Sequence, residues 1–290
     1  MNEEYLEKPQ KIKKGTLTMK NTVTQLEAVN GSQMNSYVVT TADGKILVID
    51  GGYRVDAENL LGFLREVSGS EIPHVDAWIL THAHGDHIDA FDEIVEKHWD
   101  KLTVGKIYYN FPSAQFLCRE PNYGKCILDF NRLLPRFADK IEIVYLGDEY
   151  DIGDAHIEIL YTPNGELPGY INNTSVVFML TLGGKKMLFL GDAEPAEGER
   201  LLALYKGTGK LKADYVQMAH HGQGGVERDV YEEIAPKACF WCAPGWLWDN
   251  DGGGGFNTHC FKTVIVRGWM EELGVTEHYV LKDGRQTVEL

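Results

Sequence analysis

Three histidines and two aspartates fall within the stretch "ILTHAHGDHIDAF", residues 79–91. His82 and His84 alternate, so both side chains can face one side where the backbone is extended. Asp86 and His87 follow after a glycine, which permits a sharp turn. Imidazole nitrogen and carboxylate oxygen are suitable ligands for zinc, and also for iron or manganese. The spacing therefore predicts a metal site, and four donors this close could serve two neighbouring ions.

Two later stretches place similar residues at the ends of predicted strands. "KKMLFLGDAEP" has Asp192 after an apolar run, and "DYVQMAHHG" has His220 and His221 after another. A Gly-Asp pair at a strand end is more often a turn or a helix cap. Together with the first cluster, however, the two stretches supply a carboxylate that could bridge two ions and a further imidazole. A hydrolytic site with two metal ions needs both.

The elements that must position these residues are strands and helices in two similar halves. The first half has extended stretches, a hairpin turning at 42–44, a helix at 57–67, a buried strand at 75–81, and a helix after the histidine loop. The second half has a Gly-Gly hairpin at 183–184 and a helix at 196–205, and the chain ends in a predicted hairpin turning at 283–284. Strand-rich halves with covering helices predict two sheets packed face to face, with helices outside.

The composition is that of an acidic globular protein. Hydrophobic residues make up 43% and charged residues 24%, and 28 Lys and Arg stand against 43 Asp and Glu, a formal charge of −15. Because nucleic-acid affinity comes mostly from Lys and Arg at phosphates, polymeric DNA or RNA is an unfavourable partner. A small anionic substrate remains compatible, since a bound metal can dominate the local field.

The chain shows no signal for a membrane or for export. The first residues lack an apolar signal region, and no apolar run approaches the roughly 20 residues that span a bilayer. The five cysteines are an odd number and fit reduced thiols, and Cys239 and Cys242 should point to opposite faces of a strand. We therefore predict a cytoplasmic protein with one domain over 1–290, which includes a charged N-terminal segment at 1–14.

The motifs resemble those of a known family. "THAHGDH" is similar to the signature of the metallo-β-lactamase-fold superfamily, and "ILVIDGG", "LFLGDAE" and "MAHHG" match its flanking motifs in the right order. The "GDAE" then "HHG" pair resembles the branch that contains the hydrolase domain of the competence DNA-uptake channel and the phosphorylcholine esterases. The resemblance extends from about Thr18 to Leu290.

This resemblance implies an α/β (α+β) fold, a four-layer αββα sandwich of two mixed β-sheets with helices on the outer faces. It also implies two metal sites that share one carboxylate, with Asp50 orienting a ligand histidine. Of the histidine pair, His220 is the favoured ligand, because it comes first after the strand, and His221 would orient it or touch substrate. The predicted metal ligands are His82, His84, Asp86, His87, Asp192 and His220, and the predicted catalytic residues are Asp86, His221 and His259.

The chain departs from the family pattern at two places, and a further position, His259, has two alternative roles. Many members have a third histidine for the first metal, but no histidine lies between His156 and His220, so that site should be more open or only one site should be filled. Asp89 stands where relatives carry glycine and is either a helix N-cap or an extra acid near the metals. His259 either contacts a substrate oxyanion or has a structural role at a helix start.

The resemblance implies a metal-dependent hydrolase whose two divalent cations activate a water molecule. Zinc is the favoured metal, with manganese or iron as alternatives, and a small phosphodiester is the favoured substrate. The alternatives are hydrolysis of another ester, a thioester or a lactam, a di-iron redox protein, or a binding module with a degenerate site. Flavodiiron-type relatives carry a glutamate where this chain has His84, which disfavours the redox alternative. The sequence leaves the physiological substrate and the oligomeric state open.

Overall fold

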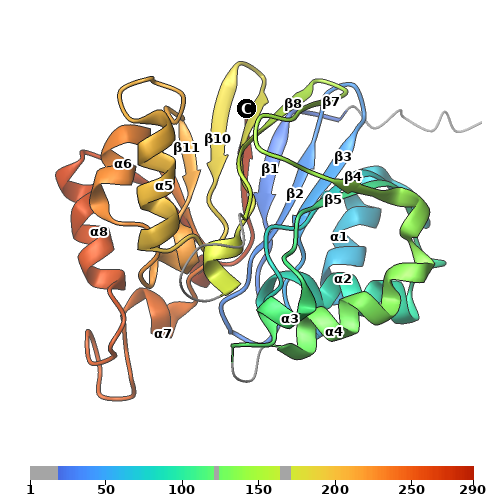
Figure 1. The fold of residues 1–290 in the computed structure, drawn as a ribbon, viewed down its shortest axis with the longest axis horizontal. Coiled ribbons are helices and arrows are strands. Elements are labelled where there is room, and N and C mark those ends of the chain that lie inside the picture. Colours follow the sequence, from blue (N-terminus) through green and yellow to red (C-terminus); the bar gives the residue numbers. More distant parts are fainter. Residues whose placement is uncertain (1–18, 121–123, 164–170) are drawn as a thin grey trace, which may run out of the picture.

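The computed structural model describes residues 19–120, 124–163 and 171–290. The charged segment at 1–14 lies outside these residues. Two seven-stranded sheets pack face to face, and helices cover the outer face of each sheet, so that four layers follow one another across the molecule (Figure 1). The predicted αββα sandwich of two mixed sheets is confirmed.

The first sheet is built mainly from the first half of the chain. Its strand order is β14-β1-β2-β3-β4-β5-β6, with antiparallel pairs from β14 to β3 and parallel pairs from β3 to β6. The strands are β1 (Thr22–Gln25), β2 (Ser36–Thr40), β3 (Ile46–Asp50), β4 (His74–Ile79), β5 (Thr103–Tyr109), β6 (Ile141–Ile143) and β14 (Gln286–Glu289).

The second sheet repeats this arrangement. Its order is β13-β12-β11-β10-β9-β8-β7, with antiparallel pairs from β7 to β10 and parallel pairs from β10 to β13. The strands are β7 (Glu149–Ile152), β8 (Ala155–Tyr161), β9 (Val177–Leu182), β10 (Lys185–Phe189), β11 (Tyr215–Gln217), β12 (Ala238–Trp241) and β13 (Glu277–Val280).

The helices separate into two groups, one for each sheet (Figure 1). Apolar residues of the first group pack with the first sheet, those of the second group pack with the second sheet, and a third cluster fills the space between the sheets. The first group is α1 (Ala57–Ser68), α2 (Gly85–Lys97), α3 (Ala114–Leu117) and α4 (Gly124–Leu133), and the second is α5 (Pro195–Tyr205), α6 (Arg228–Ile234), α7 (Gly245–Trp248) and α8 (Thr263–Glu272).

Two of the three predicted hairpins are present. β2 and β3 pair across the turn at 42–44, and β9 and β10 pair across Gly183 and Gly184, whose φ angles of 57° and 76° favour glycine. The predicted hairpin at 283–284 is wrong, because β13 belongs to the second sheet and β14 to the first. The turn there carries the chain from one sheet to the other, and a local turn signal cannot distinguish the two outcomes.

Cys239 in β12 and Cys242 directly after this strand pack on opposite sides of the second sheet, as predicted. Cys239 packs in the cluster between the second sheet and its helices, and Cys242 packs between the sheets. Both are free thiols. They therefore form no shared site.

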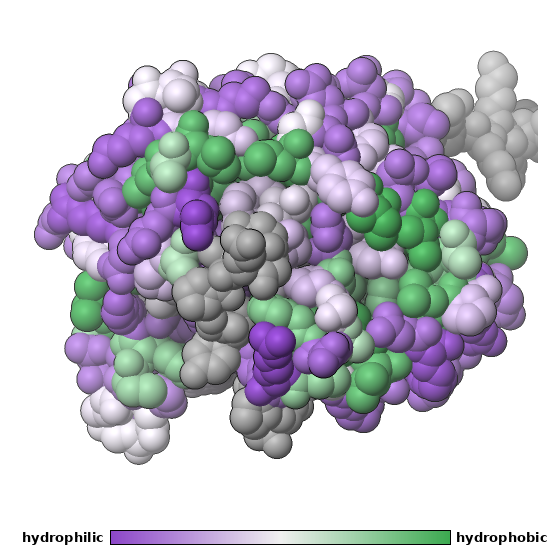
Figure 2. Space-filling model, viewed as in Figure 1, coloured by the Kyte–Doolittle hydropathy of each residue, from purple (hydrophilic) through white to green (hydrophobic). Residues whose placement is uncertain are grey.

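The face shown in Figure 2 is mostly hydrophilic, with hydrophobic side chains in scattered patches. Across the described residues, no helix combines the length and apolar character that crossing a membrane requires. The cytoplasmic location stays a prediction from the sequence.

Candidate metal centre

The first half of the chain supplies four potential ligands from the end of β4 and the start of α2. His82 and His84 lie in the connection after β4, and His84 has extended backbone angles as the N-cap of α2. Asp86 and His87 belong to the first turn of the helix. The helix therefore begins earlier than the sequence indicated, and it brings Asp86 and His87 to the same end of the first sheet as the two alternating histidines.

Gly85 has a different role from the predicted one. It is not among the residues with positive φ, but a Cβ there would lie 3.0 Å from Asp89 Oδ2 and 3.4 Å from Cys126 Sγ. Glycine here thus leaves room for Asp89 and Cys126 and does not provide a sharp turn. The predicted N-cap role of Asp89 is wrong, because Asp89 lies inside α2 and His84 is the N-cap.

The second half of the chain supplies ligands from the ends of β10 and β11, two neighbouring parallel strands. Asp192 follows β10, and Gly191 before it has a φ of 56°. A Cβ at Gly191 would lie 2.8 Å from the hydroxyl of Ser175, which accepts the backbone N–H of Asp192 at 3.0 Å. The close approach of Ser175 therefore holds Asp192 in place.

The histidine pair lies in the 3-10 turn η5 (Ala219–Gly222) after β11, in an unusual backbone conformation. His220 and His221 have φ angles of 50° and 57°, in the left-handed region that residues with a Cβ rarely adopt. Gly222 follows with a φ of 81°, and a Cβ there would overlap the ring of Trp241. This turn sends the two neighbouring imidazoles in different directions.

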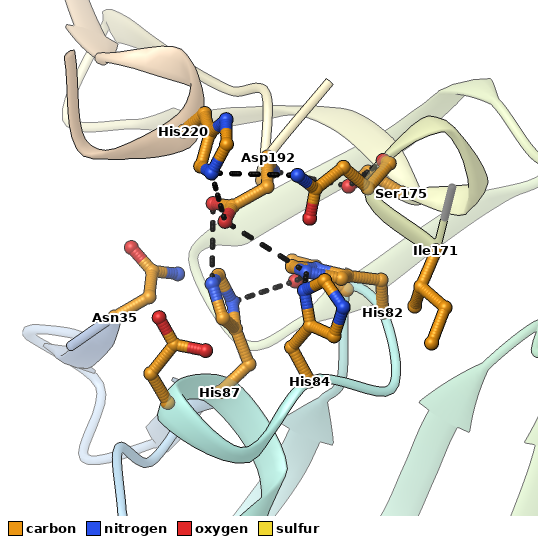
Figure 3. A network of polar contacts seen from close by, with 12 residues as sticks. Asn35, His82, His84, His87, Ile171, Ser175, Asp192 and His220 are labelled. Carbon is orange, nitrogen blue, oxygen red and sulfur yellow. Dashed lines mark hydrogen bonds and ion pairs between the residues drawn. The ribbon is translucent and has the colours of Figure 1, made fainter. Parts of the chain in front are cut away.

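His82, His84 and Asp192 form the first group of potential ligands. His82 Nε2 lies 3.1 Å from His84 Nδ1 and 3.8 Å from Asp192 Oδ2. All three side chains are buried, and Figure 3 shows them directed toward one another. Burial, and then the charge of His87, lower the pKa of His82 well below its usual value, so this imidazole is held neutral, as a metal ligand must be.

Asp86, His87, Asp192 and His221 form the second group. His87 Nε2 lies 3.1 Å from Asp192 Oδ1, and His221 Nε2 lies 3.0 Å from Asp86 Oδ2 and 3.3 Å from Asp192 Oδ2. Asp192 therefore belongs to both groups, in the position of a bridging carboxylate. The sequence predicted these residues to meet, and the structure brings them together from both halves of the chain.

The chemistry of the second group fits a cation. Among the described residues, His87 Nε2, His221 Nε2 and Asp192 Oδ1 are buried and have no hydrogen bond, although they lie within about the spacing of ligands on one ion. Burial alone would raise the pKa of Asp192, but the charges of His221, His87 and His220 hold it well below its usual range. An ionised carboxylate between imidazole nitrogens is an arrangement that favours a positive charge at this point.

Asp50, at the end of β3, contacts a histidine of this group, as the family resemblance implied. Its Oδ2 lies 2.7 Å from His87 Nδ1, and the same carboxylate accepts the backbone N–H and the hydroxyl of Thr81. Burial would lower the pKa of His87, but Asp192 and Asp50 together raise it to about 10. Asp50 thus contacts the Nδ1 side of the His87 ring, and Nε2 on the other side is directed at Asp192.

The two members of the histidine pair differ in their positions. The side chain of His221 is completely buried, whereas that of His220 is 22% exposed and its Nε2 lies 3.9 Å from Asp192 Oδ2. His220 is absent from both ligand groups found among the described residues. The geometry thus disagrees with the preference for His220 as the ligand and favours His221, because the left-handed turn directs the second imidazole inward.

His220 is surrounded by polar side chains. Its Nε2 lies 2.6 Å from Gln223 Nε2 and 3.3 Å from Asn172 Nδ2, and Asn172 also donates to Glu194 at 2.9 Å. Asn172 belongs to the 3-10 turn η4 (Ile171–Thr174). No sequence pattern indicated Asn172 or Gln223, since their amide side chains are not typical metal ligands or acid-base groups.

His259 lies in the loop before α8, where its ring stacks on Phe261 with 4.3 Å between the ring centroids. Its Nδ1 accepts the backbone N–H of Cys260. In neither ligand group that the described residues form does His259 take part. Of the three residues predicted to be catalytic, the structure therefore brings only Asp86 and His221 to the cluster.

The fold and the paired clusters define a class of protein, namely αββα sandwiches with metal-binding residues at the ends of their strands. A family model of the metallo-beta-lactamase superfamily matches residues 29–273, so the chain belongs to that superfamily, whose members are mostly hydrolases. The family resemblance inferred from the motifs is confirmed.

Three known proteins are similar to the chain to different extents. ComE operon protein 3 of Bacillus subtilis (strain 168) is 27% identical over 171 residues, which are 57% of this chain and 20% of that protein. The beta-lactamase-like protein 2 homolog of Caenorhabditis elegans is 26% identical over 204 residues, 69% of this chain and 59% of that protein. The chain thus spans less than two thirds of either relative. CmlA, a diiron beta-hydroxylase from Streptomyces venezuelae, has a TM-score of 0.54 at 15% identity, covering 93% of this chain and 54% of that chain, and this likeness shows the fold alone.

Proposed function

We propose that the protein is a metal-dependent hydrolase with two divalent cations, zinc in the first instance, that acts on a small phosphodiester. The first cation would be held by His82, His84 and Asp192, and the second by Asp86, His87, Asp192 and His221. The observation that supports this proposal most is the position of Asp192 in both groups, since a shared carboxylate can hold two cations close enough to act on one substrate.

Bound at these positions, the cations would lower the pKa of a shared water to near neutrality and bind a phosphoryl or carbonyl oxygen of the substrate. The protein's own residues position this chemistry. Asp50 and Ser175 hold His87 and Asp192 by direct contacts. His220 lies 3.9 Å from Asp192 and contacts the amide groups of Asn172 and Gln223, and these three side chains would offer hydrogen bonds to substrate oxygens.

The choice of a phosphodiester is supported by the motifs and by the ligand count. The "GDAE" and "MAHHG" stretches resemble the phosphorylcholine esterase branch, and the first group has no third histidine within the described residues. Fewer protein ligands leave more room for substrate oxygens on the first cation. The net charge of −15 favours a small substrate over polymeric nucleic acid.

The test combines metal analysis with a panel of chromogenic phosphodiester, phosphomonoester, thioester and lactam substrates. We expect about two equivalents of metal and fastest turnover of bis(p-nitrophenyl) phosphate after addition of zinc or manganese. Asp86→Ala should lose most of this activity, while the exposed Asp100→Ala should keep it.

Three results would reject the proposal in different ways. Metal well below one equivalent, with Asp86→Ala as active as the natural protein, would exclude a metal-dependent hydrolase. Preference for a thioester or lactam would exclude only the phosphodiester. Iron absorbance with oxygen consumption and without hydrolysis would identify a di-iron redox protein.

A further inference from the structure

The two ring nitrogens of His84 face different surroundings. Nδ1 lies 3.1 Å from His82 Nε2, inside the first ligand group, whereas Nε2 lies 3.5 Å from Oε1 of Glu120. Both side chains are largely buried, with 8% of His84 and 12% of Glu120 exposed. The Glu120 carboxylate thus faces Nε2, the ring nitrogen of His84 that is directed away from the cluster.

Glu120 is itself held in this position. It follows α3, and its Oε2 accepts the backbone N–H of Ile171 at 2.7 Å, at the start of η4. Figure 3 shows Ile171 on the side of the cluster where His82 and His84 lie. With one oxygen bound to the backbone, the other is left to face His84.

The arrangement repeats one seen at the second ligand group. There Asp50 lies behind His87, on the ring nitrogen that does not face Asp192. A carboxylate in this position draws the imidazole proton to itself, leaves the opposite nitrogen as a lone-pair donor, and makes that donor more basic. Each ligand group therefore has one histidine backed by a buried carboxylate, although the two carboxylates come from unrelated parts of the chain.

We propose that Glu120 is a positioning residue for the first metal site, where it holds His84 with Nδ1 directed at the cation. This inference rests on the proposed two-metal function and explains how a site with only three protein ligands is kept in shape. Glu120 also joins the α3 region to η4 through its contact with Ile171. In η4, the backbone carbonyl of Asn172 accepts a hydrogen bond from the hydroxyl of Ser175. Ser175 in turn holds Asp192. The Glu120 carboxylate therefore contacts one ligand of the first cation, His84, and is linked through η4 to the residue that holds another, Asp192.

The experiment measures each metal site separately. Asp86→Ala leaves the first ligand group complete, and His82→Ala leaves the second group complete. Glu120→Ala and Glu120→Gln are introduced into both backgrounds and into the natural chain, with the exposed Glu199→Ala as the matched control. Zinc dissociation constants are obtained by competition with a chromophoric chelator, and thermal unfolding of each metal-free protein is recorded alongside.

We expect Glu120→Ala to weaken zinc binding about 10- to 100-fold in the Asp86→Ala background, as the loss of a carboxylate behind a ligand histidine does elsewhere. Glu120→Gln should have a smaller effect, because the amide oxygen can still accept a hydrogen bond. In the His82→Ala background both changes should leave zinc affinity within about threefold, and Glu199→Ala should have no effect in any background.

Two outcomes would overturn the role of Glu120 while leaving the two-metal function intact. One is unchanged zinc affinity in the Asp86→Ala background. The other is an equal loss in both backgrounds with a lower unfolding temperature of the metal-free protein, which identifies a structural role. If the natural chain binds no zinc, the proposed function itself fails, and the inference fails with it.

Discussion

Asp50 Oδ2 lies 2.7 Å from Nδ1 of His87, and both side chains are completely buried. The carboxylate reaches this position because Asp50 ends β3 and the histidine connection follows β4, the neighbouring parallel strand. Asp50 also adopts a positive φ of 54°, a conformation that costs energy for a residue with a Cβ. A strained backbone at Asp50 is consistent with a functional role for this residue in holding His87.

Replacement of Asp50 by asparagine should weaken metal binding at the second group about 10- to 100-fold. An amide can present an N–H to His87 Nδ1, which must then accept it, so the proton moves to Nε2 and the lone pair for a metal is lost. The measurement is a zinc titration of Asp50→Asn beside the exposed control Asp100→Asn. Equal affinity in the two variants would show that Asp50 does not set the tautomer of His87.

His221 and His220 should differ in their effect on metal content. His221→Ala removes a completely buried group between Asp86 and Asp192 and should lower the bound metal by about one equivalent. His220→Ala removes a partly exposed ring 3.9 Å from Asp192 and should leave both equivalents in place. Metal analysis of the two purified variants is the measurement. Loss of an ion from His220→Ala alone would restore the ligand assignment favoured by the sequence.

Gly222→Ala should destabilise the protein more than Gly184→Ala does. Both glycines have positive φ, but a Cβ at Gly184 meets nothing within 4 Å, whereas one at Gly222 overlaps the ring of Trp241. Gly184→Ala should therefore cost about 1 kcal/mol in the free energy of unfolding, from backbone strain alone. Gly222→Ala should cost at least about 2 kcal/mol and should also displace His221. Urea unfolding and metal analysis of both variants test this, and equal costs would contradict it.

The sequence predicted the fold, and most of its candidate ligands lie together in the structure, because the relevant signals are local. Strand, turn and helix patterns identified the layers, and His82, His84, Asp86, His87 and Asp192 follow strands whose ends meet. The geometry favours His221 over His220 as the ligand because two successive left-handed residues redirect both rings, and no sequence pattern indicates this conformation.

The residues that the sequence could not indicate act through distant contacts. Glu120 and His84 are separated by 36 positions, and their contact depends on how the α3 region packs against η4. The last predicted hairpin was wrong for a related reason, because a turn signal does not say in which sheet the next strand will pair.

A final prediction concerns Asp92, a buried residue of α2. Both of its carboxylate oxygens lack a hydrogen-bond partner among the described residues. Burial, and then the nearby charge of Asp89, raise its pKa to about 8, although Arg54 and Arg132 oppose the shift and Asp129 adds to it. Asp92 is therefore protonated in the folded protein at neutral pH, whereas an unfolded chain releases this proton near pH 4.

The sign of the pH effect follows from this difference. Between about pH 4 and pH 8 the unfolded state binds fewer protons than the folded state, so this group makes stability fall as pH rises, by at most about 1.4 kcal/mol per pH unit. Asp92→Asn removes the titration and keeps the shape, so its free energy of unfolding should rise relative to the natural protein as pH increases over this window. The measurement is urea unfolding of both proteins with a metal chelator, at intervals from pH 5 to pH 8, with Asp100→Asn as the control. A difference that stays constant or shrinks with pH would show that Asp92 is already ionised in the folded state, in which case the surrounding arginines outweigh the effect of burial.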